Sequence, residues 1–323
     1  MQKKRLFFIL KLIASGIAIG LLFCLIDLKS FFTAISLADY RFLAIAFLIG
    51  CATPAVNAIK IKLLLPGSAI TIRYIVFTNF AALFLRFTIP TDLGAELGRA
   101  YYFRRKTGSA ATAFSAIVLD RYFGLFSQVL VFGAASLFSG ISNGSLFWVR
   151  FGMSAVAAAV LLAGFLIGLS FLPAIKKSSR KGFTRISDAL ARFSRYAHEL
   201  RSMPWRVFAV AGISIGFHCL TLLMIMITSA AYHLSLPFHE AAAISLSATV
   251  SFVIPVTVGG LGIVEGIYTG LYALFDLQKE IGLAVSLTVR VMAMIMALPG
   301  ALFVIYGERI IPGKGKEKGA RQP

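Results

Sequence analysis

Seven ionisable residues lie inside or beside apolar stretches that are long enough to cross a membrane. An unpaired charge at the centre of a bilayer costs at least about 2.5 to 3.5 kcal/mol on insertion scales, so each group needs a partner or a hydrated cavity. Charges in such places mark substrate or ion pathways by default. The seven are Arg86, Asp92, Glu96, Asp120, Arg121, Glu265 and Arg290.

Two of the glutamates are followed by an arginine at the same distance. Arg121 lies 25 residues after Glu96, and Arg290 lies 25 residues after Glu265. We expect each couple to form an acid–base pair that faces a central site, with the aspartate beside Arg121 and Arg86 nearby. A narrower interpretation is that the pairs only hold helices together and touch no substrate.

Each glutamate also follows a segment with proline and glycine, residues 90–96 and 255–265. We expect these segments to break the helices and to expose backbone N–H groups at half-helix N-termini, where a lipid phosphate can bind. Small residues can equally serve close helix packing in lipid, which is the alternative for any single glycine. The residues concerned are Pro90, Gly94, Gly98, Pro255, Gly259, Gly260 and Gly262.

The surrounding sequence is that of a helical membrane protein. Hydrophobic residues make up 59% of the chain and charged residues 14%, against about 25% charged in a soluble domain. The apolar runs reach the roughly 20 residues that a spanning helix needs, and they lack the alternation of a barrel strand. We predict an all-α polytopic membrane protein with six full spans, near 6–26, 42–59, 110–139, 147–173, 206–231 and 280–306, and two re-entrant helical hairpins, near 72–98 and 240–275.

The first of these runs has an alternative interpretation. The basic segment Met1–Arg5 followed by Leu6–Ile26 is also the pattern of a signal peptide. Because no cleavage site with small residues follows, we favour a retained span.

The Lys and Arg residues indicate orientation, because basic loops stay cytoplasmic. The net charge of +19 lies in short segments between apolar runs, which argues against nucleic-acid binding. We therefore expect a bacterial or archaeal cytoplasmic membrane protein with both termini cytoplasmic and with hairpins that enter from opposite sides. The predicted cytoplasmic segments hold 25 of the 32 Lys and Arg residues: Met1–Lys11, Lys60–Arg73, Arg99–Lys106, Lys176–Arg206 and the region after Tyr306.

The pattern of Pro, Gly, Glu and distal Arg thus occurs twice in opposite orientations, as in an inverted-topology repeat. A chance match is the alternative, since the Pro-to-Glu spacing is six residues in one copy and ten in the other.

The segment 174–206 between the two predicted membrane halves carries apolar residues at spacings of three and four with interspersed arginines. This pattern indicates a basic amphipathic helix on the anionic cytoplasmic leaflet. The expected organisation is a first membrane half (1–173), this cytoplasmic linker (174–206), a second half (207–307) and a disordered basic tail (308–323).

No cofactor or metal is expected. Cys24, Cys51 and Cys219 lie in apolar runs without a CxxC pair, and the histidines show no ligand spacing. A GxxxxGK[ST] segment, the motif of an ATP-binding loop, is also missing. If the chain transports a lipid, the driving force therefore has to come from a gradient or from the lipid's own distribution.

Three stretches of the sequence resemble the lysylphosphatidylglycerol synthase transmembrane family of flippase-like proteins. They are Arg86 to Arg105 (RFTIPTDLGAELGRAYYFRR), Ala113 to Leu125 (AFSAIVLDRYFGL) and Pro255 to Glu265 (PVTVGGLGIVE), and they stand in the family's order. The resemblance extends over nearly the full chain and implies two inverted halves with re-entrant hairpins. It also implies movement of anionic or aminoacylated phospholipids, or of related lipid-phosphate carriers of the polyprenyl-phosphate type, between leaflets.

The family motif adds Arg99 to the candidate site. Asp92 departs from the motif, which leaves the headgroup preference open. Bifunctional members carry a cytoplasmic aminoacyl-transferase domain, and residues 174–205, the longest predicted non-spanning segment, are too few for one. The motif falls on Pro90, Gly94, Glu96, Arg99, Asp120, Arg121, Gly260, Gly262 and Glu265.

We expect a lipid translocase rather than an enzyme. The headgroup would contact Arg121, Arg290 and the hairpin glycines, while the two partner glutamates hold these arginines. One alternative is an intramembrane enzyme that modifies a lipid phosphate, for which Asp92 and Glu96 are the close pair of acids. Another is an accessory subunit of an envelope-glycolipid pathway, which would form a stable complex and transport nothing alone.

Overall fold

The computed structural model of the chain is helical and contains no strand in the residues that it describes. These are residues 24–65, 68, 70–88, 94–137, 203–251 and 257–310, with a few positions between 13 and 22. The predicted span 147–173, most of the span 6–26, nearly all of the predicted linker and most of the predicted tail lie outside the described residues.

Four described helices are long and apolar enough to cross a membrane, and they match four of the six predicted spans. They are α3 (Tyr40–Leu64), α6 (Ala110–Leu137), α9 (Pro204–Ala231) and α12 (Lys279–Ile310). The shortest, α3, has 25 residues and extends about 37 Å, which exceeds the roughly 30 Å hydrocarbon core of a bilayer. The chain is therefore a membrane protein.

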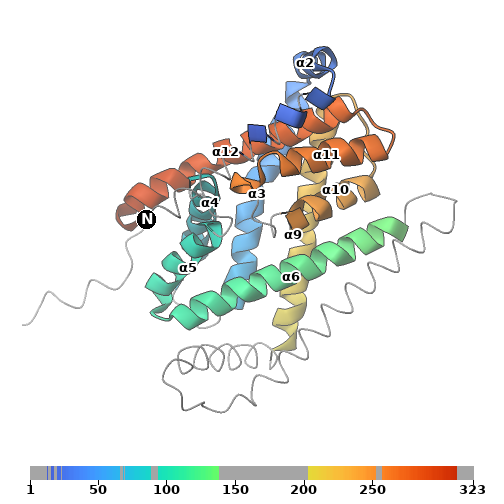
Figure 1. The fold of residues 1–323 in the computed structure, drawn as a ribbon. Coiled ribbons are helices and arrows are strands. Elements are labelled where there is room, and N and C mark those ends of the chain that lie inside the picture. The colour runs from blue at the N-terminus through green and yellow to red at the C-terminus, as the bar shows by residue number, and fades with distance from the viewer. Residues whose placement is uncertain are drawn as a thin grey trace, which may run out of the picture.

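The long helices α3 and α9 lie side by side at the centre of the fold (Figure 1). The red helix α12 crosses them toward one end and packs along α4 (Ile72–Thr88). The green helix α6 crosses them toward the other end and contacts both. Helix α5 (Gly94–Thr107) follows α4 and precedes α6 in the sequence, and it packs against both. This arrangement brings α3, α4, α5 and α6 together.

Two pairs of packed helices stand where the hairpins were predicted. In the first pair α4 packs against α5, which continues nine residues past the predicted end of the hairpin. Its last turn carries Arg104, Arg105 and Lys106, and cations are favourable at a helix C-terminus. In the second pair α10 (Phe238–Ser251) packs against α11 (Ile263–Leu274), which follows a short 3-10 turn, η2 (Val258–Gly260).

A short helix that was not predicted, α2 (Leu28–Ser36), precedes α3. The Asp27 carboxylate caps it by accepting hydrogen bonds from the backbone N–H groups of Lys29 at 3.1 Å and Ser30 at 3.4 Å. The Ser30 hydroxyl also donates to Asp27, and these bonds hold the pKa of that carboxyl below its usual value. Buried Phe31 anchors α2 to the core. Nine residues are too few for a span, so hydrophobic length did not reveal this helix.

Helix α3 contains Pro54 in its interior. Proline has no N–H, so the carbonyl of Gly50 loses its helical donor, and the Thr53 hydroxyl replaces it at 2.8 Å. The Asn79 side chain of α4 donates to the Pro54 carbonyl at 2.9 Å. This bond ties α4 to α3 in the region that holds the charged residues.

The packing of α12 on α4 depends on Gly300. A Cβ atom at Gly300 would lie 2.0 Å from the Phe80 carbonyl oxygen, so alanine has to push two helix backbones apart. We expect Gly300→Ala to lower the free energy of unfolding by about 1 to 3 kcal/mol, the range for overpacking, measured as a lower Tm in detergent. Gly212→Ala in α9 is the matched control, because no atom lies within 4 Å of its added Cβ. An equal loss in both variants would contradict the prediction.

Candidate functional site

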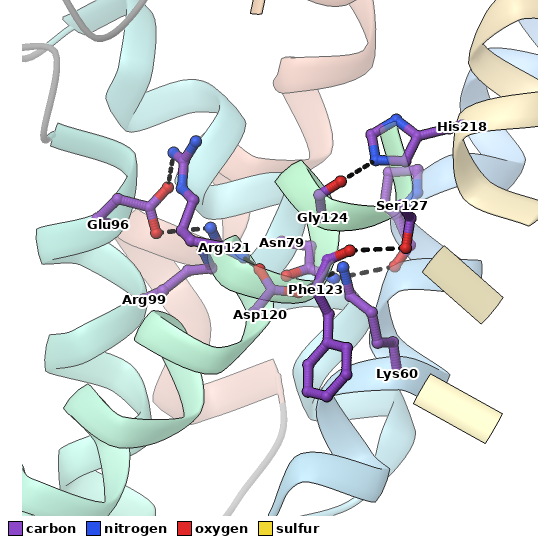
Figure 2. Close-up of polar contacts among 11 residues, drawn as sticks. Lys60, Asn79, Glu96, Arg99, Asp120, Arg121, Phe123, Gly124, Ser127 and His218 are labelled. Carbon is purple, nitrogen blue, oxygen red and sulfur yellow. Dashed lines mark hydrogen bonds and ion pairs between the residues drawn. The ribbon is translucent and has the colours of Figure 1, made fainter. Parts of the chain in front are cut away.

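Five charged side chains form a continuous network between α3, α5 and α6 (Figure 2). Lys60 Nζ lies 2.6 Å from one oxygen of Asp120, and the other oxygen accepts a hydrogen bond from Arg99 at 2.9 Å. Arg99 also donates to Glu96 at 2.5 Å, and the second Glu96 oxygen pairs with Arg121. Cations and anions therefore alternate along this network, which we call the charge chain.

The charge chain runs from the protein interior to an exposed end. Side-chain exposure is 5% for Lys60, 7% for Asp120, 9% for Arg99, 14% for Glu96 and 54% for Arg121. Its three cations and two anions leave a net charge of +1. The interior members are enclosed and neutralise one another, so the excess positive charge is accessible at Arg121.

Local helix geometry explains this gradient. Glu96 lies in the first turn of α5, where the helix dipole favours an anion, and Arg99 follows it at the i+3 position on the same face. Asp120 and Arg121 are consecutive on α6, so their side chains are about 100° apart around the helix axis. One is therefore buried against α3 and α5, while the other is exposed.

Helix α9 closes the buried end of the charge chain. The Lys60 ammonium lies 5.6 Å from the centre of the Phe217 ring. The neighbouring His218 uses its Nε2–H to donate to the Gly124 carbonyl of α6 at 2.8 Å, as Figure 2 shows. These contacts fix α3 and α6 against α9 and keep Lys60 out of reach from outside.

The second predicted couple forms a different structure, at the start of α11. Arg290 of α12 donates to Glu265 at 2.5 Å and to the carbonyls of Gly259 at 3.2 Å and Gly260 at 3.4 Å. The other Glu265 oxygen accepts the N–H of Gly262 at 2.7 Å. Glu265 is 1% exposed and Arg290 14%. This network, which we call the turn clamp, is a closed set of internal contacts.

The turn clamp holds a backbone that requires glycine. Gly259, Gly260 and Gly262 have φ values of +58°, +69° and +85°, which side chains other than glycine rarely adopt. A Cβ at Gly259 would lie 3.9 Å from the carbonyl oxygen of Arg86, so the turn rests on the last turn of α4. The Arg86 side chain is half-buried there.

The comparison with known families covers both networks. The sequence profile of the lysylphosphatidylglycerol synthase TM region matches residues 8–300, which include every member of the charge chain and of the turn clamp. The chain belongs to the lysylphosphatidylglycerol synthase transmembrane family. Comparisons with curated proteins and with solved structures gave no match. Membership of this family indicates a function that involves membrane lipid.

The predicted pairing is confirmed in this member of the lysylphosphatidylglycerol synthase transmembrane family. Glu96 pairs with Arg121 and Glu265 with Arg290. In the described part of the chain, however, no hydrogen bond or ion pair joins the two networks. Equal sequence spacing produced two pairs with unequal environments, because neighbouring helices enclose one pair and leave the other partly open.

The predicted roles of the hairpin residues are altered in part. Gly94 begins α5, but Gly98 lies inside that helix, so the prediction of a break at Gly98 is wrong. A Cβ at Gly98 would come 2.3 Å from the end of the Leu85 side chain, so Gly98 lies where α5 packs closely against α4. The N–H of Gly262 is already bonded to a carboxylate. The predicted Pro90, Asp92 and Pro255 lie outside the described residues.

Sequence reasoning missed Lys60. It was assigned to a basic cytoplasmic loop, which is wrong, because Lys60 is buried within α3 and paired with Asp120. The signal was the continuation Ile61–Leu65, which is apolar apart from Lys62 and extends the helix by more than a turn past the predicted end. A lysine in a continuing apolar helix needs an acidic partner, and Asp120 was available.

A separate pocket of about 160 Å³ lies between α6, α10 and α11. It contains no member of the charge chain or of the turn clamp. Its position near the end of α6 is distant from Arg121, since Ser136 follows Arg121 by 15 residues, or about 22 Å along the helix. Its lining consists of Phe132, Ser136, His239, Ala243, Leu271, Leu274 and Phe275.

Proposed function

We propose that the chain is a lipid translocase, a transporter rather than an enzyme, in which Arg121 receives the phosphate of a phospholipid or lipid-phosphate carrier. The observation that carries the proposal is the exposed guanidinium at the end of a charge chain with a net charge of +1. A phosphodiester is a monoanion that matches this charge, and arginine binds phosphate in a bidentate manner. The family's association with membrane lipid supports this choice of ligand.

Glu96 gives the site a second specificity. One Glu96 oxygen accepts a hydrogen bond from Arg121 and the other accepts one from Arg99. Glu96 therefore stays bonded to Arg99 when a phosphate replaces it as the partner of Arg121. An aminoacylated headgroup carries an ammonium as well as a phosphate, and the released Glu96 oxygen would accept that ammonium. The site therefore suits both anionic and aminoacylated phospholipids.

The acyl chains would stay in the bilayer. Leu97 and Tyr101 on α5 and Phe114 on α6 are exposed apolar side chains on the two helices that carry Glu96 and Arg121. Exposed apolar surface next to a charged site lets a lipid keep its chains in hydrocarbon while its headgroup reaches the arginine.

The proposal includes the wider topology that the basic loops indicate. Six spans and two re-entrant hairpins of opposite polarity form two inverted halves, with both termini on the cytoplasmic side of a bacterial or archaeal membrane. The helix pairs α4–α5 and α10–α11 are the arms of the hairpins. Helix breaks that face each other near mid-bilayer are where transporters of this kind bind substrate.

Reconstitution tests the proposal directly. Purified chain in phosphatidylcholine liposomes that contain a trace of fluorescent phosphatidylglycerol should let dithionite reach more than the outer-leaflet half of the probe. Protein-free liposomes and a phosphatidylcholine probe give the baselines. Lipid mass spectrometry of the same vesicles should find the probe chemically unchanged, whereas a modified product would favour the enzyme. No translocation by the folded, isolated chain would favour the accessory subunit.

A further inference from the structure

We propose that Lys60 and Asp120, which lie too deep to touch a headgroup, set how tightly Arg121 binds a phosphodiester anion. The inference rests on the proposed function, because it takes Arg121 as the binding residue. Both residues act through others in the charge chain and are therefore positioning residues. The link is the guanidinium of Arg99, which two carboxylates share.

Arg99 divides its donors between two helices. One terminal nitrogen bonds Asp120 of α6 at 2.9 Å, and the other bonds Glu96 of its own helix at 2.5 Å. Lys60 neutralises Asp120 from the far side at 2.6 Å. Because Lys60 balances the charge of Asp120, Arg99 is attracted less strongly to Asp120, and more of its positive charge balances Glu96. Glu96 then binds Arg121 less tightly.

Removing the charge of Lys60 should weaken anion binding. Asp120 would depend on Arg99 alone, and the charge chain would fall from +1 to zero. As Arg99 moves toward Asp120, Glu96 turns its charge to Arg121 and competes more strongly with an incoming phosphate. Salt screens this effect poorly, because the interior members of the charge chain are buried.

Removing the charge of Asp120 should have the opposite effect. Arg99 would then compensate Glu96 alone, and the charge chain would rise to +2. Arg121 would be released from Glu96 and would bind a phosphate more tightly. A variant that merely loosened the fold would weaken binding in both cases, so opposite signs are the signature of this mechanism.

Binding of a soluble probe tests the inference. The purified chain in neutral maltoside detergent is titrated calorimetrically with dihexanoyl phosphatidylglycerol, and in a second arm with inorganic phosphate, which separates a lipid headgroup from free phosphate as the source of the anion. We expect Lys60→Met to raise the Kd for the lipid by about fivefold and Asp120→Asn to lower it by about fivefold, within the range for coupled residues outside a ligand site. The double variant keeps the charge chain at +1 and should bind as the wild type does.

The controls lie in the same helix. Lys60→Arg keeps the charge and should retain the wild-type Kd. Lys62→Met removes an equal charge two residues away, where the ammonium instead bonds the carbonyls of Ser68 at 2.9 Å and Ile70 at 2.7 Å. It should leave the Kd unchanged. The Tm of every variant is measured in the same detergent.

The outcomes separate the two proposals. If Arg121→Gln binds the lipid with the wild-type Kd, the proposed function fails. If Arg121→Gln abolishes binding while Lys60→Met and Asp120→Asn shift the Kd in the same direction or not at all, the proposed function stands and the present inference is overturned. Should a single variant not fold, the double variant carries the test, and loss of its binding at an unchanged Tm would overturn the inference.

Discussion

Arg121→Gln should reduce the rate of phosphatidylglycerol translocation by about 10- to 100-fold, because a hydrogen bond to a charged group contributes about 1.5 to 3 kcal/mol. The Tm in detergent should change little, since the Arg121 side chain is 54% exposed and exposed ion pairs contribute little to stability. Glu96 also keeps Arg99 as a partner in the variant. The dithionite assay in liposomes measures the rate.

Arg104→Gln is the matched control for this variant. Arg104 is exposed in the last turn of α5 and is not part of the charge chain, so the substitution removes the same charge from the helix that packs against α6. Its translocation rate should equal that of the wild type. If the two variants lost equal activity, overall positive charge would explain transport and Arg121 would have no specific role.

The sequence predicted those parts of the fold that hydrophobic length controls. Apolar runs of roughly 20 residues can only cross a bilayer as helices, which is why α3, α6, α9 and α12 were predicted within a few residues at most boundaries. The nine-residue helix α2 has no such constraint. The extension of α3 to Leu64 was missed because Lys60 was interpreted as the start of a loop.

The pairing of charges was also predictable, because a buried charge needs a counter-charge and the spacing of 25 residues occurs twice. The difference between the pairs was not. Whether Arg121 or Arg290 is enclosed depends on the helices that pack around it. That Gly262 donates its N–H to Glu265 depends on the turn geometry. Neither fact is a property of residue type or spacing.

The two networks therefore differ in what they do with the same residue types. In the charge chain, cations outnumber anions and the last one is exposed. In the turn clamp, one arginine and one glutamate neutralise each other and also hold the backbone that separates α10 from α11. We infer that the charge chain binds the headgroup and that the turn clamp maintains a rigid helix break.

Arg290→Met should lower the free energy of unfolding by about 3 to 5 kcal/mol, the range for removing one partner of a buried ion pair. The reason is that Glu265, 1% exposed, would retain a charge without a cation. Gly259 and Gly260 would also lose the donor to their carbonyls. The loss should appear as a large fall in Tm and in the monodisperse fraction after heating. Adding Glu265→Gln should recover part of it, because the buried charge is then gone.

This prediction also distinguishes the two interpretations of the second couple. A structural clamp predicts that Arg290→Met has a lower Tm than the wild type. It also predicts that the variant translocates lipid at close to the wild-type rate at temperatures below that Tm, where it is still folded. Direct headgroup contact predicts the reverse, an unchanged Tm with a translocation rate as low as that of Arg121→Gln. That second result would contradict the closed geometry of the turn clamp. Arg290 would then have to leave Glu265 during transport, so that both arginines bind the phosphate in turn.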